Sequence, residues 1–160
     1  MRPLMITTNS PAETAEAAAA LAPHLRKGDV LILSGELAAG KTFFVQSLVR
    51  ALGSTDDALS PTFAIANFYE TPVEPFIHVD AYRLSGAKEY ADLGLDEYAE
   101  TSILAIEWGE RLGGAFSEYL SIEFQFSGSS DEGRVLLLRF IGERWTSARA
   151  DLARLGAPAR

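Results

Sequence analysis

Residues 35–42 read Gly-Glu-Leu-Ala-Ala-Gly-Lys-Thr, which matches the pattern G-x-x-x-x-G-K-[ST] of a phosphate-binding loop. The loop follows a fully apolar run at residues 30–33, which is typical of a buried parallel strand. It precedes residues 43–52, where apolar side chains recur at helical spacing until Gly53 supplies a stop. A strand, a glycine-rich loop and a helix in this order indicate an α/β fold built around a phosphate site.

Each fixed position of this loop has a physical role in holding phosphate. Gly35 and Gly40 allow the tight turn that points successive backbone N–H groups at phosphate oxygens. The following helix adds the positive end of its dipole. Lys41 can reach the β- and γ-phosphates, and the Thr42 hydroxyl can ligate magnesium. The loop therefore predicts a nucleotide and Mg²⁺ as cofactors.

Two carboxylates follow further apolar runs, Asp80 after residues 76–79 and Glu107 after residues 103–106. Side chains at the ends of parallel strands can meet beside such a loop, where they suit magnesium binding and the orientation of an attacking water. The residue types alone leave open which of the two holds the metal. His78 faces the same side as Asp80, because side chains alternate along a strand. It is either a satisfied core histidine or a member of the site.

The rest of the chain predicts one domain over residues 1–160, since no repeat, low-complexity tract or long linker divides it. Further strands are expected at residues 5–8 (as a sheet edge), 63–69, 76–82, 119–126 and 134–141. Helices are expected at 11–26 and 143–155, with one or two short helices within 88–99. Ser60-Pro61-Thr62 is either a plain turn or a source of a hydroxyl near the γ-phosphate. We expect a P-loop NTPase-like α/β fold, with a mainly parallel central sheet flanked by helices and an antiparallel C-terminal hairpin.

The composition excludes several classes of function. The chain has no cysteine, so disulfides, thiol catalysis and cysteine metal sites are excluded. The formal net charge of −8 argues against unaided binding to nucleic acid or an anionic membrane. No segment reaches the roughly 18 apolar residues that span a bilayer, and a cytoplasmic location is expected by elimination. The guanine-reading pattern Asn-Lys-x-Asp is absent from the sequence, which favours ATP over GTP.

Five motifs, in order and at matching intervals, resemble those of the bacterial TsaE (YjeE) family. They are the loop at 35–42, Ser-Pro-Thr-Phe at 60–63, His-Val-Asp-Ala-Tyr-Arg-Leu at 78–84, Leu-Gly-Leu at 93–95 and Ile-Glu-Trp at 106–108. The resemblance covers roughly residues 5–142. It implies a slow or partner-dependent Mg²⁺-ATPase needed for N6-threonylcarbamoyladenosine formation at position 37 of tRNA. In that family the ATPase works with a TsaB–TsaD pair, in which TsaD transfers the threonylcarbamoyl group, and meets tRNA only through these partners.

The resemblance also implies roles for individual residues. It assigns ATP binding to Gly35, Leu37, Ala38, Ala39, Gly40, Lys41 and Thr42, metal binding to Thr42 and Glu107, and catalytic roles to Asp80, Lys41 and Thr62. Asp80 would be the essential acid of the hydrolytic centre, and Thr62 the hydroxyl of a mobile loop. The segment from about Asn9 to Thr14 would touch adenine, with Arg134 near the nucleotide.

Three positions depart from the family pattern. Ala38 stands where glycine is usual, which costs up to about 1 kcal/mol if the position needs a positive φ. Phe43 replaces a common hydroxyl residue, so a side-chain contact to the α-phosphate is lost. Gly109 replaces a usual proline, which would loosen the turn after Glu107 and Trp108.

Two other functions compete with this interpretation. A small-metabolite kinase would pass the γ-phosphate to an acceptor other than water. A nucleotide-gated binding module would have no relevant turnover, so Lys41→Ala would abolish partner binding whereas Asp80→Ala would leave cellular function intact.

Overall fold

The computed structural model describes residues 2–36, 38–55, 66–81, 87–92, 94–112, 114–128 and 130–158. The strands are β1 (Leu4–Thr8), β2 (Val30–Gly35), β3 (Ala66–Tyr69), β4 (Phe76–Asp80), β5 (Ile103–Glu107), β6 (Tyr119–Phe126), β7 (Arg134–Ile141) and β8 (Ala157–Pro158). The α-helices are α1 (Pro11–Leu21), α2 (Lys41–Ala51), α3 (Ala87–Asp92), α4 (Asp96–Ala99) and α5 (Thr146–Leu152). Short 3₁₀ turns are η1 (Ala22–His24), η3 (Gly109–Leu112), η4 (Glu143–Trp145) and η5 (Ala153–Leu155).

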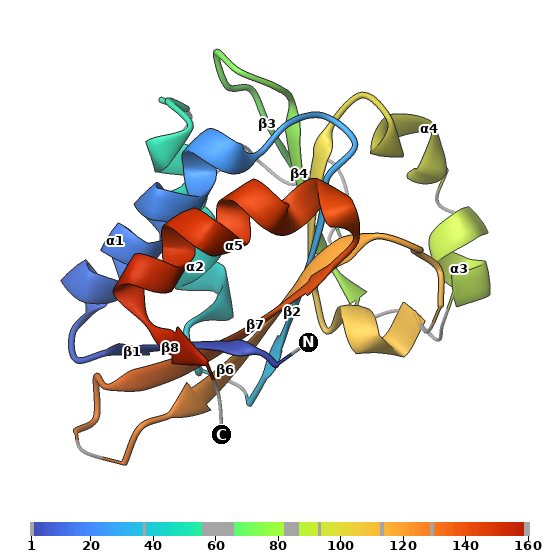
Figure 1. The fold of residues 1–160 in the computed structure, drawn as a ribbon. Coiled ribbons are helices and arrows are strands. Elements are labelled where there is room, and N and C mark those ends of the chain that lie inside the picture. Colours follow the sequence, from blue (N-terminus) through green and yellow to red (C-terminus); the bar gives the residue numbers. More distant parts are fainter. Residues whose placement is uncertain are drawn as a thin grey trace.

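The strands form one sheet in the order β3-β4-β5-β2-β6-β7-β1-β8 (Figure 1). Strands β4, β5, β2 and β6 run parallel to one another at its centre. The remaining neighbours pair antiparallel, including the β6–β7 hairpin. The predicted α/β class, parallel centre and C-terminal hairpin are therefore confirmed. Antiparallel pairing also continues past the hairpin to β1 and β8.

The two faces of the sheet carry separate apolar cores. Leu31 and Leu33 of β2 face the core made with α1, α2 and α5. Val30 faces the opposite core, which includes side chains of α3 and η3. Figure 1 shows α1, α2 and α5 gathered together, with α3 and α4 apart from them. Alternation of side chains along a strand buried on both faces explains why residues 30–33 are apolar without a break.

Two expectations drawn from the sequence need correction. The first helix ends at Leu21 and not near residue 26, because Pro23 has no N–H to continue it and the chain turns through η1. Strand β1 is not an edge: β7 flanks it on one side and the two-residue β8 on the other. The start of α1 is as predicted, with Ser10 capping the backbone N–H of Glu13 at 3.2 Å.

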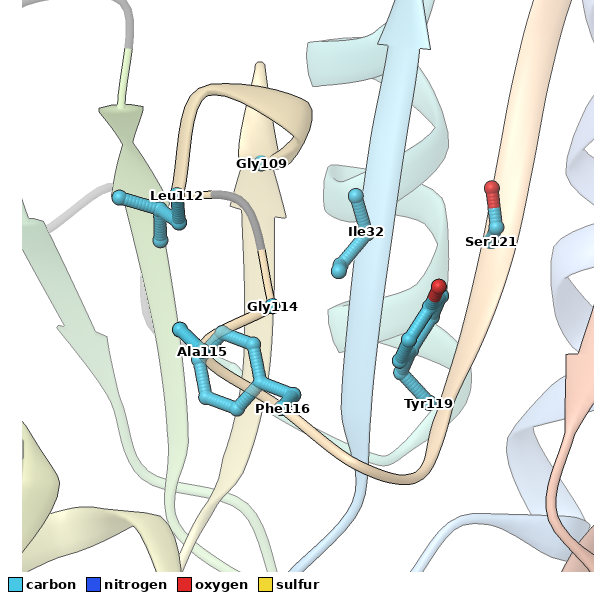
Figure 2. Close-up of a pocket in the computed structure, with 8 residues that line it drawn as sticks. All are labelled: Ile32, Gly109, Leu112, Gly114, Ala115, Phe116, Tyr119 and Ser121. Atoms are coloured by element: carbon cyan, nitrogen blue, oxygen red, sulfur yellow. The ribbon is translucent and has the colours of Figure 1, made fainter. Parts of the chain in front are cut away.

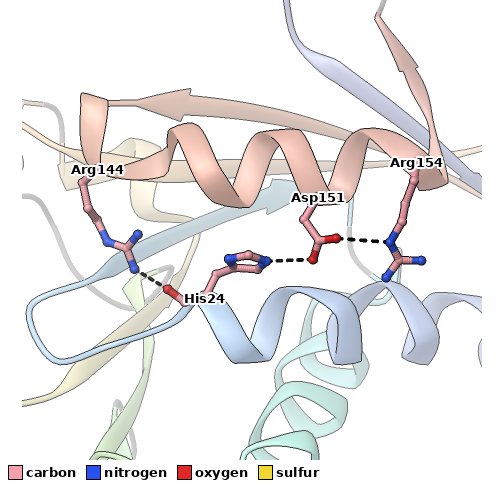
Figure 3. Close-up of polar contacts among 4 residues, drawn as sticks. All are labelled: His24, Arg144, Asp151 and Arg154. Carbon is pink, nitrogen blue, oxygen red and sulfur yellow. Dashed lines mark hydrogen bonds and ion pairs between the residues drawn. The ribbon is translucent and has the colours of Figure 1, made fainter.

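Charged side chains of the C-terminal helical segment (η4, α5 and η5) contact the segment between α1 and β2. Asp151 lies 2.8 Å from Nε2 of His24 and 3.3 Å from Nε of Arg154, and Arg144 donates to the His24 carbonyl (Figure 3). Arg144 also donates from Nε to Oδ1 of the buried Asp29, at 2.5 Å. Within the described residues, no helix has the length and apolarity needed to cross a membrane.

Candidate phosphate-binding site

The loop after β2 turns at two glycines with positive φ. Gly35 has a φ of 133°, and a Cβ there would lie 2.5 Å from the Phe124 carbonyl oxygen of β6. Gly40 has a φ of 106° and is the N-cap of α2. Both positions therefore need glycine, one for close packing against β6 and both for positive φ. The N-terminus of α2 opens at this loop, as the sequence predicted.

Lys41 is folded into the loop. Its ammonium donates to the carbonyls of Gly35 at 2.6 Å and Glu36 at 2.9 Å, and it lies 4.1 Å from the centroid of the Trp108 ring. Only 4% of the residue is exposed. A charge held by carbonyl dipoles and an aromatic face is one that a phosphate could recruit, because the ammonium can rotate its donors toward a stronger anionic acceptor.

Thr42, Glu107 and His78 form a chain of side-chain contacts beside the loop. The Thr42 hydroxyl donates to Oε2 of Glu107 at 2.9 Å, and Nε2 of His78 lies 2.5 Å from the same oxygen. Glu107 and His78 are both buried. An ionised carboxylate only accepts, so Nε2 of His78 is the donor.

The environment of Glu107 favours its charged form. Burial raises the pKa of this carboxyl, but the hydrogen bond and charge of His78, the hydroxyl of Thr42 and the charge of Lys41 outweigh it. The net pKa lies below the ordinary value of 4.5. Glu107 is therefore an ionised acceptor at neutral pH.

Asp80 lies beside Glu107, as expected from the positions of the two acids in the sequence. The residues are directly opposite one another in the parallel pair β4–β5, so their side chains leave the same face of the sheet. Among the described residues, no group of three or more histidines and acids is placed to hold a metal ion. A magnesium ion bound mainly by phosphates and water needs only one or two carboxylates from the protein, so the donor set of Thr42 and Glu107 fits such an ion.

The structure brings Gly35, Ala38, Ala39, Gly40, Lys41, Thr42, Asp80 and Glu107 to one end of the central strands. Leu37 and Thr62 lie outside the described residues, so their predicted roles stay predictions. The sequence left the role of His78 open, and the structure places it against Glu107. Because side chains two residues apart on a strand lie on the same face, the spacing of His78 from Asp80 indicated a place in the site.

A hollow of about 280 Å³ opens beside the loop. Its walls come from the start of α1, the loop, the start of α2 and the β6–β7 turn, as Pro11, Thr14, Ala38, Ala39, Gly40, Phe43, Glu132 and Arg134. Arg134 is anchored there: its Nε donates to the Ala39 carbonyl at 2.9 Å, and its guanidinium carbon lies 4.7 Å from the Phe126 ring centroid. The segment expected near adenine and Arg134 thus meet at the same hollow.

The turn after Glu107 is closely packed. Trp108 has a φ of 61°, and its N–H donates to the Leu33 carbonyl at 2.8 Å. A Cβ on Gly109 would lie 2.7 Å from Cγ2 of Ile32, so neither alanine nor proline fits without a shift. Figure 2 shows Gly109 and Ile32 on the wall of a second hollow, of about 250 Å³, on the sheet face opposite α2. Glycine at this position therefore accommodates Ile32.

Comparison with known proteins decides the family. The family model described as threonylcarbamoyl adenosine biosynthesis protein TsaE matches residues 8–136. This chain belongs to the TsaE family. A TsaE from Streptomyces coelicolor is 41% identical over 134 residues, covering 80% of this chain and 90% of the relative. A TsaE from Bacillus subtilis is 35% identical over 156 residues, covering 96% of each.

The fold comparison agrees with the TsaE assignment. The crystal structure of Bacillus subtilis YdiB matches with a TM-score of 0.77 and 32% identity, over 96% of this chain and 95% of that one. The relatives from Streptomyces coelicolor and Bacillus subtilis are both named tRNA threonylcarbamoyladenosine biosynthesis protein TsaE. The chain therefore has the TsaE role in the biosynthesis of that tRNA modification.

Ala38, which stands where glycine is usual in the TsaE pattern, has a φ of 65°. The backbone strain expected of alanine at this position is therefore present.

Proposed function

We propose that this chain binds and hydrolyses ATP with Mg²⁺, as the ATPase subunit of N6-threonylcarbamoyladenosine formation at position 37 of tRNA. The proposal is supported by one observation above all. A phosphate loop with a buried lysine lies next to a hydroxyl–carboxylate pair, with a second carboxylate in register on the neighbouring strand. This combination suits phosphoryl transfer, in which catalysis consists mainly of positioning and charge stabilisation.

Phosphate binding would use the loop backbone and Lys41. The N–H groups of the loop and of the first turn of α2 supply donors for phosphate oxygens, helped by the helix dipole. On binding, the Lys41 ammonium would exchange the Gly35 and Glu36 carbonyls for the β- and γ-phosphates. The Trp108 ring would keep the lysine stem in place, since it lies against the same ammonium.

Thr42 and Glu107 would hold the magnesium ion, which when bound neutralises charge on the phosphate oxygens. Asp80 would orient the attacking water and accept its proton, with the Thr62 hydroxyl assisting. The strand register places Asp80 beside Glu107, and Glu107 is the carboxylate that accepts the Thr42 hydroxyl. This arrangement supports different roles for the two acids, with Glu107 for the metal and Asp80 for the water.

The hollow beside the loop would receive the base. It lies between the loop and the start of α1, at the outer side of the phosphate-binding turn. Adenine is expected, because the guanine-reading motif is absent from the sequence.

The partners are proposed from the family and from charge. A TsaB–TsaD-type pair would carry the tRNA, so this subunit would meet tRNA only indirectly. Its formal net charge of −8 suits this arrangement, since direct binding to the phosphate backbone relies on Lys and Arg. Tight, salt-sensitive binding of tRNA by the isolated chain would contradict it.

The first test is ATP hydrolysis by the purified chain, alone and with a TsaB–TsaD pair. We expect slow phosphate release that rises with the pair and is lost in Lys41→Ala and Asp80→Asn. Lys27→Ala is the matched control, because Lys27 is exposed and lies before β2. Release that does not respond to the pair, or that survives Asp80→Asn, would overturn the proposed ATPase subunit. Transfer of the γ-phosphate to a small acceptor would instead establish a kinase.

A further inference from the structure

The first turn of α2 presents an aromatic ring at the hollow. Phe43 is 38% exposed, whereas its neighbours Phe44 and Val45 are 2% and 0% exposed and lie in the core. Ligand pockets are lined mainly by apolar and aromatic side chains, so an exposed ring in the wall of a hollow is a candidate ligand contact. Phe43 is one residue beyond Thr42, the loop's magnesium-ligand candidate, and it lines the same hollow as Ala39 and Gly40 of the loop.

The other walls of this hollow are largely apolar. Pro11, Ala38 and Ala39 contribute carbon surface without side-chain donors. The polar groups present are mostly engaged already. Oγ1 of Thr14 lies 2.7 Å from Oγ1 of Thr8, and Arg134 donates to the carbonyls of Ala39, Asp131 and Gly133. Glu132 adds a carboxylate to the lining. A ligand in this space would therefore combine ring contact with few side-chain hydrogen bonds.

Arg134 lines the same hollow and is held in place. Its guanidinium is held between three backbone carbonyls and the Phe126 ring, so it is a rigid plane and not a flexible cation. An aromatic ring and a guanidinium plane that line one hollow next to a phosphate loop form a cradle for a heteroaromatic base.

From these contacts we infer that Phe43 is a specificity-determining residue, whose ring makes nucleotide binding depend on the base. The inference rests on the proposed function, since it concerns the base of the nucleotide whose phosphates the loop would hold. The occupant is the purine of a nucleoside triphosphate, because a two-ring base offers the larger face for contact. The phosphates gain no binding energy from a phenyl ring, because it has neither a hydrogen-bond donor nor a positive charge.

The test compares binding of MgATP, MgCTP and magnesium tripolyphosphate to the full chain by calorimetry. In Phe43→Ala, which removes the ring without adding a hydroxyl, we expect MgATP to bind on the order of tenfold more weakly, with tripolyphosphate unchanged. Phe43→Trp should keep the preference for MgATP over MgCTP, and Phe43→Leu should lose most of it. Tyr98→Ala is the matched control, because Tyr98 is an aromatic residue, 45% exposed, on α4 and outside the hollow.

The outcomes separate this inference from the proposed function. Equal weakening of MgATP and tripolyphosphate binding in Phe43→Ala would overturn the inference, since the ring would then act through the loop. Unchanged MgATP binding in Phe43→Ala would overturn it as well, while leaving ATP binding established. If the unmodified chain bound neither ATP nor tripolyphosphate, both the inference and the proposed function would fall.

Discussion

Nε2 of His78 lies 2.5 Å from Oε2 of Glu107, and the Thr42 hydroxyl donates to the same oxygen. Two donors from two different elements, β4 and α2, therefore fix one carboxylate of β5. His78→Asn should weaken Mg²⁺-dependent ATP binding by about 10- to 100-fold, because a partner that orients a metal ligand is lost. Calorimetry with Mg²⁺ and with EDTA separates this effect from phosphate binding. His24→Asn serves as control, and equal weakening under both conditions would contradict a role through the metal.

The lowered pKa of Glu107 predicts how its contribution to stability depends on pH. The folded pKa lies below the ordinary 4.5, so the unfolded chain takes up the proton first as the pH falls. The stabilisation is fully present above that ordinary value and is lost as the pH drops through the folded pKa. Urea unfolding of the unmodified chain and of Glu107→Gln should differ most near neutral pH and converge in acid. If the difference in unfolding free energy grew as the pH fell, burial would outweigh the hydrogen-bond donors in setting the pKa of Glu107.

Ala38→Gly should stabilise the protein by about 0.5–1 kcal/mol, because Ala38 has a φ of 65° and glycine adopts this conformation without strain. The neighbouring Ala39 is buried and is not among the residues of positive φ. Ala39→Gly should therefore have the opposite sign, destabilising by about 0.5–1 kcal/mol. Midpoints of urea unfolding measure both changes. Two shifts of the same sign would mean that strain at Ala38 is relieved elsewhere.

Gly109→Ala should destabilise the fold by about 1–3 kcal/mol, because its Cβ would meet Cγ2 of Ile32 at 2.7 Å. Shortening Ile32 removes the clash, so the double variant with Ile32→Ala should be more stable than the sum of the single changes predicts. A double-mutant cycle by urea unfolding gives this coupling, expected at about 1 kcal/mol. Strict additivity would show that the turn moves away from β2 instead.

Arg144→Ala should cost about 3–5 kcal/mol, because it leaves the buried carboxylate of Asp29 without its ion pair. Arg154→Ala removes a similar contact with Asp151, but both of those side chains are largely exposed, so its cost should stay below about 1 kcal/mol. The two arginines flank the same helix, which makes them a matched pair (Figure 3). Similar losses for both would show that the Asp29 pair is open to solvent.

Short sequence patterns predict those parts of the site that are formed by neighbouring residues in the chain. The loop, its strand and its helix follow from residues 30–52 alone, and Asp80 lies beside Glu107 because both end parallel strands. The contact of His78 with Glu107 also depends on which strands are neighbours and in what register, which no short pattern encodes. The hollow at Phe43 depends on the β6–β7 turn reaching the loop, a long-range contact that no short pattern around Arg134 encodes.

The central position of β2 also sets the order in which the site can form. Val30 is paired with Leu104, and Gly35 with Phe124, so both neighbours of this strand come from far along the chain. Closing such long loops costs entropy before any contact repays it, which makes the topology slow to fold. During synthesis β2 has only its β5 neighbour available until residue 124 of β6 has left the ribosome. A nucleotide would then bind only after the site has formed at the end of folding. Its binding would slow unfolding of the native state and would leave the folding rate unchanged.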